Sequence, residues 1–330
     1  MTDARDLPPE LDPQRFATHR AVVRGTEIAF VREGVGGVPL VCVHGWPETK
    51  RIFWKVIDPL AAAGFEVIVP DLRGFGESPP GADGIHDVPT HARDVHALVA
   101  EHLGHERFVL LGGDLGGPVV QDLALRFPGV CTRMVLFNSP LPFDKERMGH
   151  LRTRPAAEAG DYYLRQGTDP DGLAAELDTP EQRRRYVATF YTSRFWAHPG
   201  AFAEGGPGRL GLSAAVDFHT EPFADAASLR ASFGAYAATF SEAARREPSV
   251  LRRNPDVQAL VLFGPSDHVI YPDFDLMAAA VFPDHVGPFL LRDCGHFVPW
   301  EAPHALVSAT AAFCADLLAA GARPRGRAEG

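Results

Sequence analysis

The segment Leu110-Leu111-Gly112-Gly113-Asp114-Leu115-Gly116-Gly117 decides the fold of this chain. An apolar run precedes it, a helical pattern follows it, and glycines lie two positions before and two positions after the central carboxylate. Glycines at these positions let a strand turn sharply into a helix and leave the residue between them exposed on a strained bend. We therefore predict a strand over 108–111, a tight turn with Asp114 at its tip, and a helix over 117–127.

The side chain at the tip of this turn indicates the chemistry. An aspartate has an unperturbed pKa near ~3.9, so it is ionised at neutral pH and attacks without first giving a proton to a base. Carboxylates displace leaving groups at saturated carbon, such as an epoxide oxygen or a halide, and form an alkyl ester of the enzyme. Two other interpretations of Asp114 remain open at this point, a helix N-cap and a variant dinucleotide-binding loop, although the G-x-G-x-x-G spacing of that loop is missing.

Composition excludes several classes of partner. The chain has 330 residues, of which 45% are hydrophobic and 22% charged, with a net charge of −10, as expected for a globular protein with a large core. The acidic balance argues against nucleic-acid and anionic-membrane partners, which recruit basic patches. Residues 1–13 are polar and lack an apolar segment that could be a signal peptide or membrane span, so we predict a cytoplasmic protein. The four cysteines have no metal-like spacing and predict reduced thiols, and homodimerisation is left open.

The order of predicted elements indicates a parallel sheet. Strands alternate with helices of ten to fourteen residues along the first part of the chain, which is typical of a sheet covered by helices on both faces. Buried-strand runs then stop from about residue 140 to 248, where helical segments are expected over 155–167, 179–196 and 225–245. We predict a core over 1–139 and 249–320, a helical cap inserted over 140–248, and a disordered tail over 321–330. The core strands are expected at 20–23, 27–32, 38–43, 65–69, 108–111, 133–137, 258–263 and 288–291, and its helices at 52–63, 90–103, 117–127, 272–281 and 303–320.

Three further motifs follow predicted strands. They are His44-Gly45-Trp46-Pro47-Glu48, the segment Asp71 to Ser78, and Cys294-Gly295-His296-Phe297. The carboxyl ends of parallel strands share one edge of a sheet, which is where ligand sites lie in such folds. A second carboxylate, Asp267, lies just past the strand over 258–263, so the order along the chain is nucleophile, acid, histidine.

With these motifs the sequence resembles the epoxide hydrolases of the α/β-hydrolase superfamily, close to the haloalkane and haloacetate dehalogenases. The resemblance covers about residues 20 to 320. It implies an α/β-hydrolase fold, with a mostly parallel eight-stranded sheet flanked by helices and an inserted helical cap. It also implies that Asp114 opens an epoxide to a vicinal diol through an alkyl-enzyme ester, with no cofactor and no metal.

The resemblance assigns the remaining roles by position. His296 would activate the water that hydrolyses the ester, and Asp267 would orient the His296 ring. Asp267 is preferred as the acid because the alternative position, after the strand over 133–137, holds Asn138. The backbone N–H groups of Trp46 and Leu115 would form the oxyanion hole. The bond before Pro47 is expected to be cis, as it is in the family. The substrate, an apolar small-molecule epoxide, would contact His44, Pro47 and Phe297.

Epoxide opening also needs a proton donor for the oxygen that leaves. Epoxide hydrolases use cap tyrosines for this purpose, and Tyr162 and Tyr236 lie at the expected positions, early and late in the cap. Tyr163, Tyr186 and Tyr191 are rivals, and any of these rings could simply pack on helices.

Two other functions are left open. A dehalogenase would use the same nucleophile, but Leu115 and Val119 stand where the related dehalogenases have a halide-binding tryptophan or carboxylate-binding arginines. A non-catalytic ligand-binding protein of this fold is the second alternative. The histidines at 86, 91, 96, 102 and 105 are spaced too irregularly for one helical face and are expected at the surface, and His219 is expected to be structural.

Overall fold

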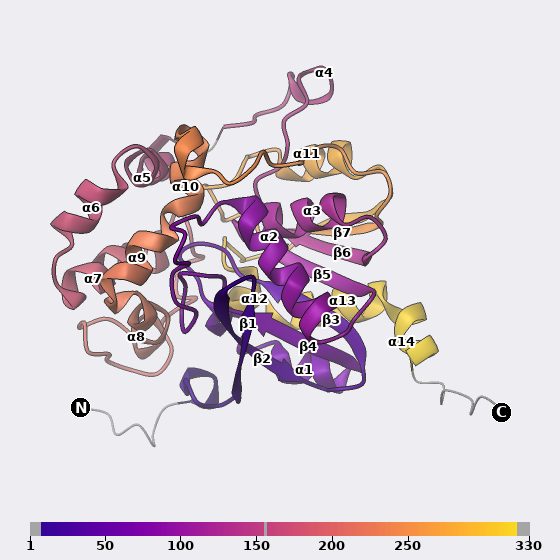
Figure 1. The fold of residues 1–330 in the computed structure, drawn as a ribbon, viewed down its shortest axis with the longest axis horizontal. Helices are drawn as coiled ribbons and strands as arrows, with labels where there is room; N and C mark the ends of the chain where they lie inside the picture. The colour runs from indigo at the N-terminus through magenta and orange to yellow at the C-terminus, as the bar shows by residue number, and fades with distance from the viewer. Residues whose placement is uncertain (1–7, 155–156, 322–330) are drawn as a thin grey trace.

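A computed structural model describes residues 8–154 and 157–321, without the side chains of residues 157–160. Its centre is one eight-stranded sheet, with strands in the order β1-β2-β4-β3-β5-β6-β7-β8 (Figure 1). The first three strands in that order pair antiparallel and the others pair parallel. The predicted α/β-hydrolase architecture is confirmed. The strands are β1 Thr18–Val23, β2 Thr26–Glu33, β3 Val38–Val43, β4 Phe65–Pro70, β5 Phe108–Gly113, β6 Cys131–Phe137, β7 Ala259–Phe263 and β8 His285–Leu290.

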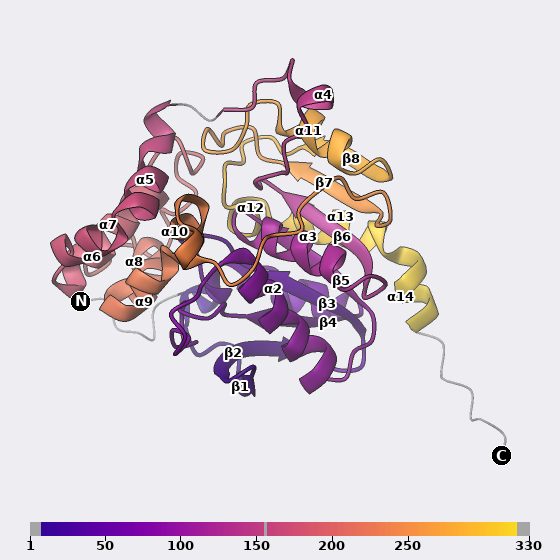
Figure 2. The ribbon, with the colours of Figure 1, turned by 45° about the horizontal axis from the view of Figure 1, so that its top comes forward.

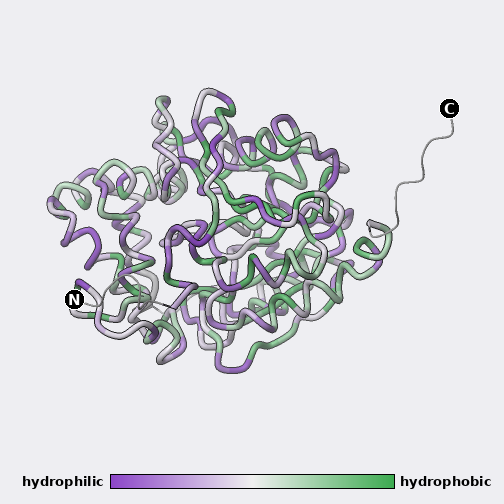
Figure 3. The backbone as a smooth tube through the Cα atoms, turned by 90° about the horizontal axis from the view of Figure 1, so that it is seen from below, coloured by the Kyte–Doolittle hydropathy of each residue, from purple (hydrophilic) through white to green (hydrophobic). Residues whose placement is uncertain are grey.

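Helices cover both faces of the sheet. Helices α2 and α3 pack against each other on one face, and α1 contacts α13 on the other (Figures 1 and 2). The central strands β3, β4, β5 and β7 consist almost entirely of buried residues, and the hydrophobic segments gather in the interior of this core (Figure 3). The core helices are η2 Pro9–Leu11, η3 Lys50–Phe53, α1 Ile57–Ala62, α2 Val88–His96, η4 Ala97–His102, α3 Gly116–Arg126, α11 Phe274–Val281, α12 Val298–Glu301, α13 Pro303–Phe313 and α14 Ala315–Gly321.

Some predicted helices are broken. The helix expected over 52–63 is two short elements, η3 and α1, and the one expected over 303–320 is bent between α13 and α14. The last turns of the helix expected over 90–103 are π-helical. Among the described residues, no single helix is both long and apolar enough to cross a bilayer, and only α13 and α14 taken together meet that criterion, with a bend of 68° between them. The predicted disordered tail lies, from residue 322, outside the described residues.

Most of the chain between β6 and β7 forms a group of helices, α5 to α10, beside the carboxyl edge of the sheet, whereas the short α4 contacts α11 of the core (Figures 1 and 2). The regular elements described there are helices, with one isolated bridge between Pro207 and Ser213. Four of them, α4, α6, α8 and η5, were not predicted from the sequence. The elements are α4 Lys145–Met148, α5 Ala157–Thr168, α6 Pro170–Glu176, α7 Pro180–Tyr191, α8 Ala214–Thr220, η5 Glu221–Ala224, α9 Ala226–Ser232, α10 Gly234–Phe240 and η6 Glu242–Ala244.

The histidines of α2 and the loop before it correct the surface prediction. His86 and His91 are buried, and both ring nitrogens of His91 lack a hydrogen-bond partner. Burial lowers the pKa of His86 to about 4, so this ring is neutral. Gly74 and Gly234 lie directly against His86, because a Cβ at either glycine would come within about 3.1 Å of its side chain. The sequence pattern missed this burial because the covering residues come from distant segments.

Candidate active site

Asp114 lies at the tip of a sharp bend between β5 and α3. Its φ of +43° falls in the left-handed region, which non-glycine residues rarely adopt. The bend is possible because β5, β6 and the start of α3 approach closely: a Cβ at Gly113 would lie 2.1 Å from the Phe137 ring, and one at Gly117 would lie 1.7 Å from Ser139 Oγ. The Asp114 N–H donates to the carbonyl of Asn138 at 2.8 Å, which ties the bend to the end of β6.

The three residues predicted as a triad meet at this bend. His296 Nδ1 and Asp267 Oδ2 are 2.8 Å apart and hydrogen-bonded. The other ring nitrogen, Nε2, lies 3.2 Å from Asp114 Oδ2 but is not aligned for a hydrogen bond. All three side chains are buried. The arrangement leaves Nε2 directed at the Asp114 carboxylate.

The charge state of His296 depends on the two carboxylates. Burial lowers the pKa of the ring, but the charges of Asp267 and Asp114 outweigh burial and hold the pKa well above its usual value. In the unreacted protein the ring is therefore an imidazolium between two carboxylates. Loss of the charge on Asp114 would lower the pKa of the ring.

Asn138 is the residue at this site whose role the sequence missed. Its Nδ2 donates to Asp267 Oδ2 at 2.8 Å and to the Gly264 carbonyl at 3.0 Å, and its Oδ1 accepts from the Gly264 N–H at 2.8 Å. Asp267 Oδ1 also accepts from the Val269 N–H at 2.7 Å. Asn138 is not an acid, but it holds the carboxylate of Asp267 in position. The sequence signal that could have indicated this role is the position of Asn138, a polar residue directly after β6.

The loop after β3 supplies the predicted oxyanion-hole residue. The Trp46 N–H donates to Asp114 Oδ1 at 2.6 Å, and the Trp46–Pro47 peptide bond is cis, as predicted. Leu115 directly follows Asp114 as the N-cap residue of α3. Gly45 has no room for a side chain, since a Cβ would lie 2.4 Å from Asp114 Cβ.

The residues expected to contact substrate fall into two groups. His44 is fully buried, with Nδ1 2.8 Å from the Gly45 carbonyl and Nε2 accepting from the Leu72 N–H at 3.0 Å. Both ring nitrogens bond to the backbone, so His44 holds this loop to the start of the loop after β4. A contact of His44 with substrate stays a prediction. The Pro47 carbonyl accepts a hydrogen bond from Tyr191 Oη, and the Phe297 ring packs on Tyr191 at 4.7 Å.

Glu48 is a second residue that sequence reasoning left without a role. Its carboxyl group is buried and accepts the Gly45 N–H at 2.5 Å, beside Asp114 and His296. Burial raises its pKa to about 8, the charge of His296 opposes the rise, and that of Asp114 adds to it. Glu48 is therefore largely protonated at neutral pH and can donate a hydrogen bond in the active-site region.

Tyr162 and Tyr236 converge on the Trp46 indole. The Tyr162 ring stacks on it at 5.4 Å, the Tyr236 ring meets it edge-on at 5.7 Å, and the two phenol rings are 5.8 Å apart. Burial is the main cause that raises the pKa of each phenol well above its usual value, and the charge of Asp114 also contributes. Both hydroxyls therefore stay protonated as donors.

The rival tyrosines are placed differently. Tyr163 is 37% exposed and stacks on Phe240. Tyr191 uses its hydroxyl on the Pro47 carbonyl. Tyr186 Oη accepts a hydrogen bond from Gln166 Nε2 at 2.9 Å. Among the described tyrosines between β6 and β7, Tyr162 and Tyr236 are the two whose rings contact Trp46.

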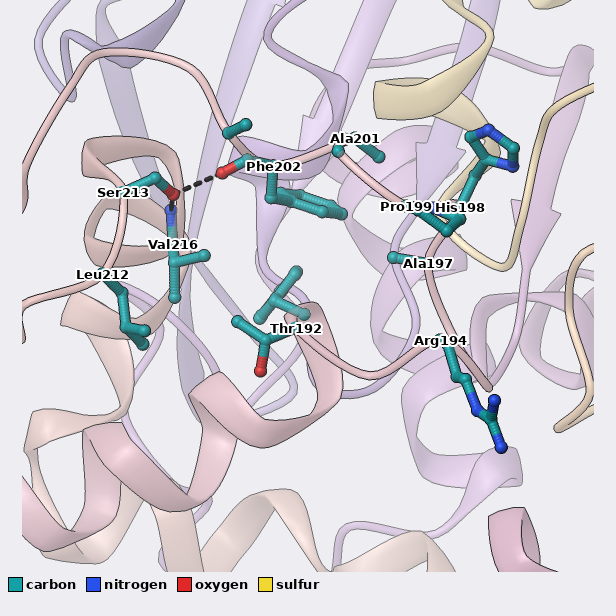
Figure 4. Close-up of a pocket in the computed structure, with 13 residues that line it drawn as sticks. Thr192, Arg194, Ala197, His198, Pro199, Ala201, Phe202, Leu212, Ser213 and Val216 are labelled. Atoms are coloured by element: carbon teal, nitrogen blue, oxygen red, sulfur yellow. Dashed lines mark hydrogen bonds between the residues drawn. The ribbon is translucent and has the colours of Figure 1, made fainter.

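A cavity of about 330 Å³ lies on the outer side of Tyr191, and its lining includes neither Asp114 nor His296 (Figure 4). Its walls are mainly the loop between α7 and α8, with Ser213 Oγ bonded to the Phe202 carbonyl and the Val216 N–H. Two of its lining residues, Phe202 and Tyr191, pack on the ring of Phe297, which directly follows His296. We do not assign it to the chemical step.

Fold and site together define an α/β hydrolase that carries an aspartate where most such enzymes have serine. The α/β-hydrolase fold family matches residues 38–303, so the chain belongs to this family. The chain is 28% identical over 304 residues to the soluble epoxide hydrolase of Corynebacterium sp. strain C12, covering 91% of this chain and 97% of that protein. The structure is similar to that of the epoxide hydrolase CorEH, with a TM-score of 0.74 and 26% identity over 92% of this chain and 99% of that one. Juvenile hormone epoxide hydrolase from the silkworm Bombyx mori shares the fold, with a TM-score of 0.67 and 21% identity over 92% of this chain and 76% of that one.

Proposed function

We propose that this protein is an epoxide hydrolase that converts an apolar epoxide to a vicinal diol through an ester on Asp114. The observation that carries the proposal is the position of the Asp114 carboxylate. One oxygen accepts the Trp46 N–H at 2.6 Å, and the other lies 3.2 Å from His296 Nε2. The similarity to soluble epoxide hydrolases over nine-tenths of the chain supports the choice of substrate class.

The first step is ring opening. Asp114 Oδ2 attacks an epoxide carbon, the C–O bond of the ring breaks, and the released oxygen takes a proton from Tyr162 or Tyr236. An alkoxide is a poor leaving group, so donors matter here more than they would for a halide. The contact of both phenol rings with Trp46 supports their assignment as donors, because Trp46 also holds the nucleophile.

The second step is hydrolysis of the ester. Ester formation removes the charge of Asp114, so the pKa of His296 falls and the ring becomes a base for water. The ring, whose own proton returns to the phenolate left by ring opening, takes a proton from the water that attacks the ester carbonyl carbon. The carbonyl oxygen, formerly Oδ1, already faces the Trp46 N–H and gains negative charge there. As this oxyanion collapses, the ester C–O bond breaks, the second proton of the water goes to the leaving diol oxygen, and Asp114 is released as a carboxylate. Asp267 stabilises the imidazolium that forms, and the Leu115 N–H is the proposed second donor to the oxyanion.

The helical segment over 140–248 is the proposed cap over this site. Trp46 Nε1 donates to Ser232 Oγ of α9 at 3.1 Å, and Arg51 of the core pairs with Glu221 at 2.8 Å. These contacts support a cap that closes directly over the loop after β3. Leu115 and Val119 are both buried and apolar, which favours an epoxide over a halide or a haloacid.

Turnover in water enriched in oxygen-18 tests the ester. After many turnovers of styrene oxide, the Asp114 peptide should gain label, because the attacking oxygen stays in the carboxylate when the ester is cleaved. The Asp114→Asn variant is the control and should form neither diol nor labelled peptide. Active enzyme whose Asp114 peptide stays unlabelled would exclude the ester, and chloride release from chloroalkanes without diol formation would establish the dehalogenase instead.

A further inference from the structure

One short segment of the insertion, residues 195–198 between α7 and α8, is bonded to both loops that carry the triad. Its Phe195 carbonyl accepts the N–H of His268, in the loop of the proposed acid, at 2.9 Å. Its Trp196 carbonyl accepts the N–H of His296 itself at 2.7 Å. We refer to residues 195–198 as the anchor segment. The reaction proposed above gives these bonds no role.

Glu301 joins the anchor segment to the histidine loop a second time. Its Oε2 accepts the N–H groups of His198 and Gly295, both at 2.8 Å, and its Oε1 accepts the Phe297 N–H at 2.9 Å. Gly295 and Phe297 are the two chain neighbours of His296. A single carboxylate therefore binds the backbone on both sides of His296 and the backbone of the insertion.

Helix capping accounts for only part of this arrangement. Phe297 is the N-cap residue of α12, and a side chain from the first turns of a helix often accepts the N–H of the N-cap residue. The bonds to His198 and Gly295 lie outside the helix. Burial raises the pKa of Glu301, but its three N–H donors and the charge of His296 oppose that rise. A carboxylate that accepts several N–H groups makes charge-assisted hydrogen bonds, which are stronger than neutral ones.

The histidine loop also packs directly against the anchor segment. A Cβ at Gly295 would lie 2.4 Å from the Trp196 carbonyl oxygen and 2.8 Å from the His198 nitrogen, so only glycine fits there. The Trp196 side chain is buried, and its ring lies 4.6 Å from the His296 imidazole and 5.1 Å from the Tyr162 phenol. The anchor segment thus lies between the base and one of the proposed proton donors.

The two steps of the proposed reaction depend on different parts of this site. Ester formation uses the Asp114 carboxylate and a phenol, and the described hydrogen bonds of Glu301 go to neither group. Ester hydrolysis needs His296 Nε2 at the attacking water, and a displacement of about 1 Å can slow such a step by up to about a hundredfold. Bonds that fix the backbone on both sides of His296 should therefore act mainly on hydrolysis.

We propose that Glu301 is a positioning residue that holds His296 for ester hydrolysis by bonding its loop to the anchor segment. The inference rests on the proposed epoxide hydrolase function. It gives the helical insertion a second role. Besides carrying the proposed proton donors for ring opening, the insertion holds the base that acts on the ester.

Single-turnover kinetics with styrene oxide separate the two steps. Glu301→Gln keeps the size of the side chain but replaces one acceptor oxygen by an amino group, which cannot accept a backbone N–H. We expect ester hydrolysis to slow about tenfold and ester formation to change by less than about twofold, so that alkyl-enzyme accumulates. Glu221→Gln is the matched control, because it makes the same change in another contact between core and insertion, the ion pair with Arg51. Both of its rates should equal those of the wild type. Equal slowing of both steps by Glu301→Gln, or unchanged hydrolysis, would overturn the positioning role.

Hydrogen exchange tests the link to the insertion without a substrate. In the wild type the N–H groups of His198, Gly295 and Phe297 should all be protected, because one carboxylate binds them. Glu301→Ala removes every acceptor and should speed exchange in the anchor segment and in the histidine loop together. An unprotected His198 N–H in the wild type, or faster exchange in the histidine loop alone, would overturn the link. Wild-type protein that does not open styrene oxide would instead refute the proposed function, and the exchange result would not depend on that outcome.

Discussion

Replacing Asp114 by asparagine should lower the pKa of His296 strongly, because it removes one of the two charges that hold the ring protonated. Nε2 lies 3.2 Å from Asp114 Oδ2. Two unit charges at that distance interact by roughly 5 kcal/mol at an effective dielectric of about 20. Because 1.36 kcal/mol equals about one pKa unit, this is between three and four units. The amide that remains can still accept a hydrogen bond, so we expect a fall of about two to four units.

This change imitates the proposed alkyl-enzyme, in which Asp114 would be equally uncharged. The assay is a nuclear magnetic resonance titration of protein with nitrogen-15 in its histidines, wild type against Asp114→Asn. His102, which is exposed on the last turn of η4, serves as the internal reference, and its signals should be the same in both proteins. If the His296 pKa of the variant stayed within about half a unit of the wild type, loss of the Asp114 charge could not turn His296 into a base. The proposed second step would then fail.

Three other perturbations have expected outcomes. The folded-state pKa of Glu48, about 8, exceeds its unfolded value of 4.5, so the protein takes up a proton on folding between these values and loses stability as pH rises through 8. The wild type should therefore lose a few kcal/mol more of its free energy of unfolding than Glu48→Gln does between pH 5.5 and pH 8.5, as measured by denaturant unfolding. An equal loss in both proteins would contradict this. Gly116→Ala would place a Cβ 2.1 Å from the Val43 carbonyl oxygen and should lower the free energy of unfolding by about 1–3 kcal/mol; an unchanged melting temperature would disprove the close contact. Asn138→Ala should release Asp267 and slow ester hydrolysis about tenfold, so intact-mass measurements during turnover should find accumulated alkyl-enzyme, and a steady-state ester level like that of the wild type would argue against an orienting role.

The sequence predicted the residues that glycine patterns and strand ends define. Asp114, His296 and Asp267 each follow a strand of the parallel sheet, so the shared carboxyl edge brings them together without knowledge of distant contacts. The Trp46–Pro47 turn was likewise predicted from its local motif and the family resemblance.

What the sequence did not predict depends on contacts between distant segments. His91 looked like a surface residue because its spacing along α2 fits no single helical face, yet the loop over 71–78 and its Phe75 ring help to bury it. The role of His44 in holding the loop depends on the Leu72 N–H, which follows a different strand. The role of Asn138 arises from two loops that follow β7 and β8, more than a hundred residues away.

Asn138 also sets a limit on recombining this enzyme with its relatives. It is the first residue after β6, so it stands where the helical insertion leaves the sheet, yet its side chain binds Asp267 and its carbonyl accepts the Asp114 N–H. A chimaera that takes its insertion from another parent should therefore keep residues through 138 from this one. A splice one residue earlier would exchange the helical insertion and, with it, the side chain that holds Asp267 in position.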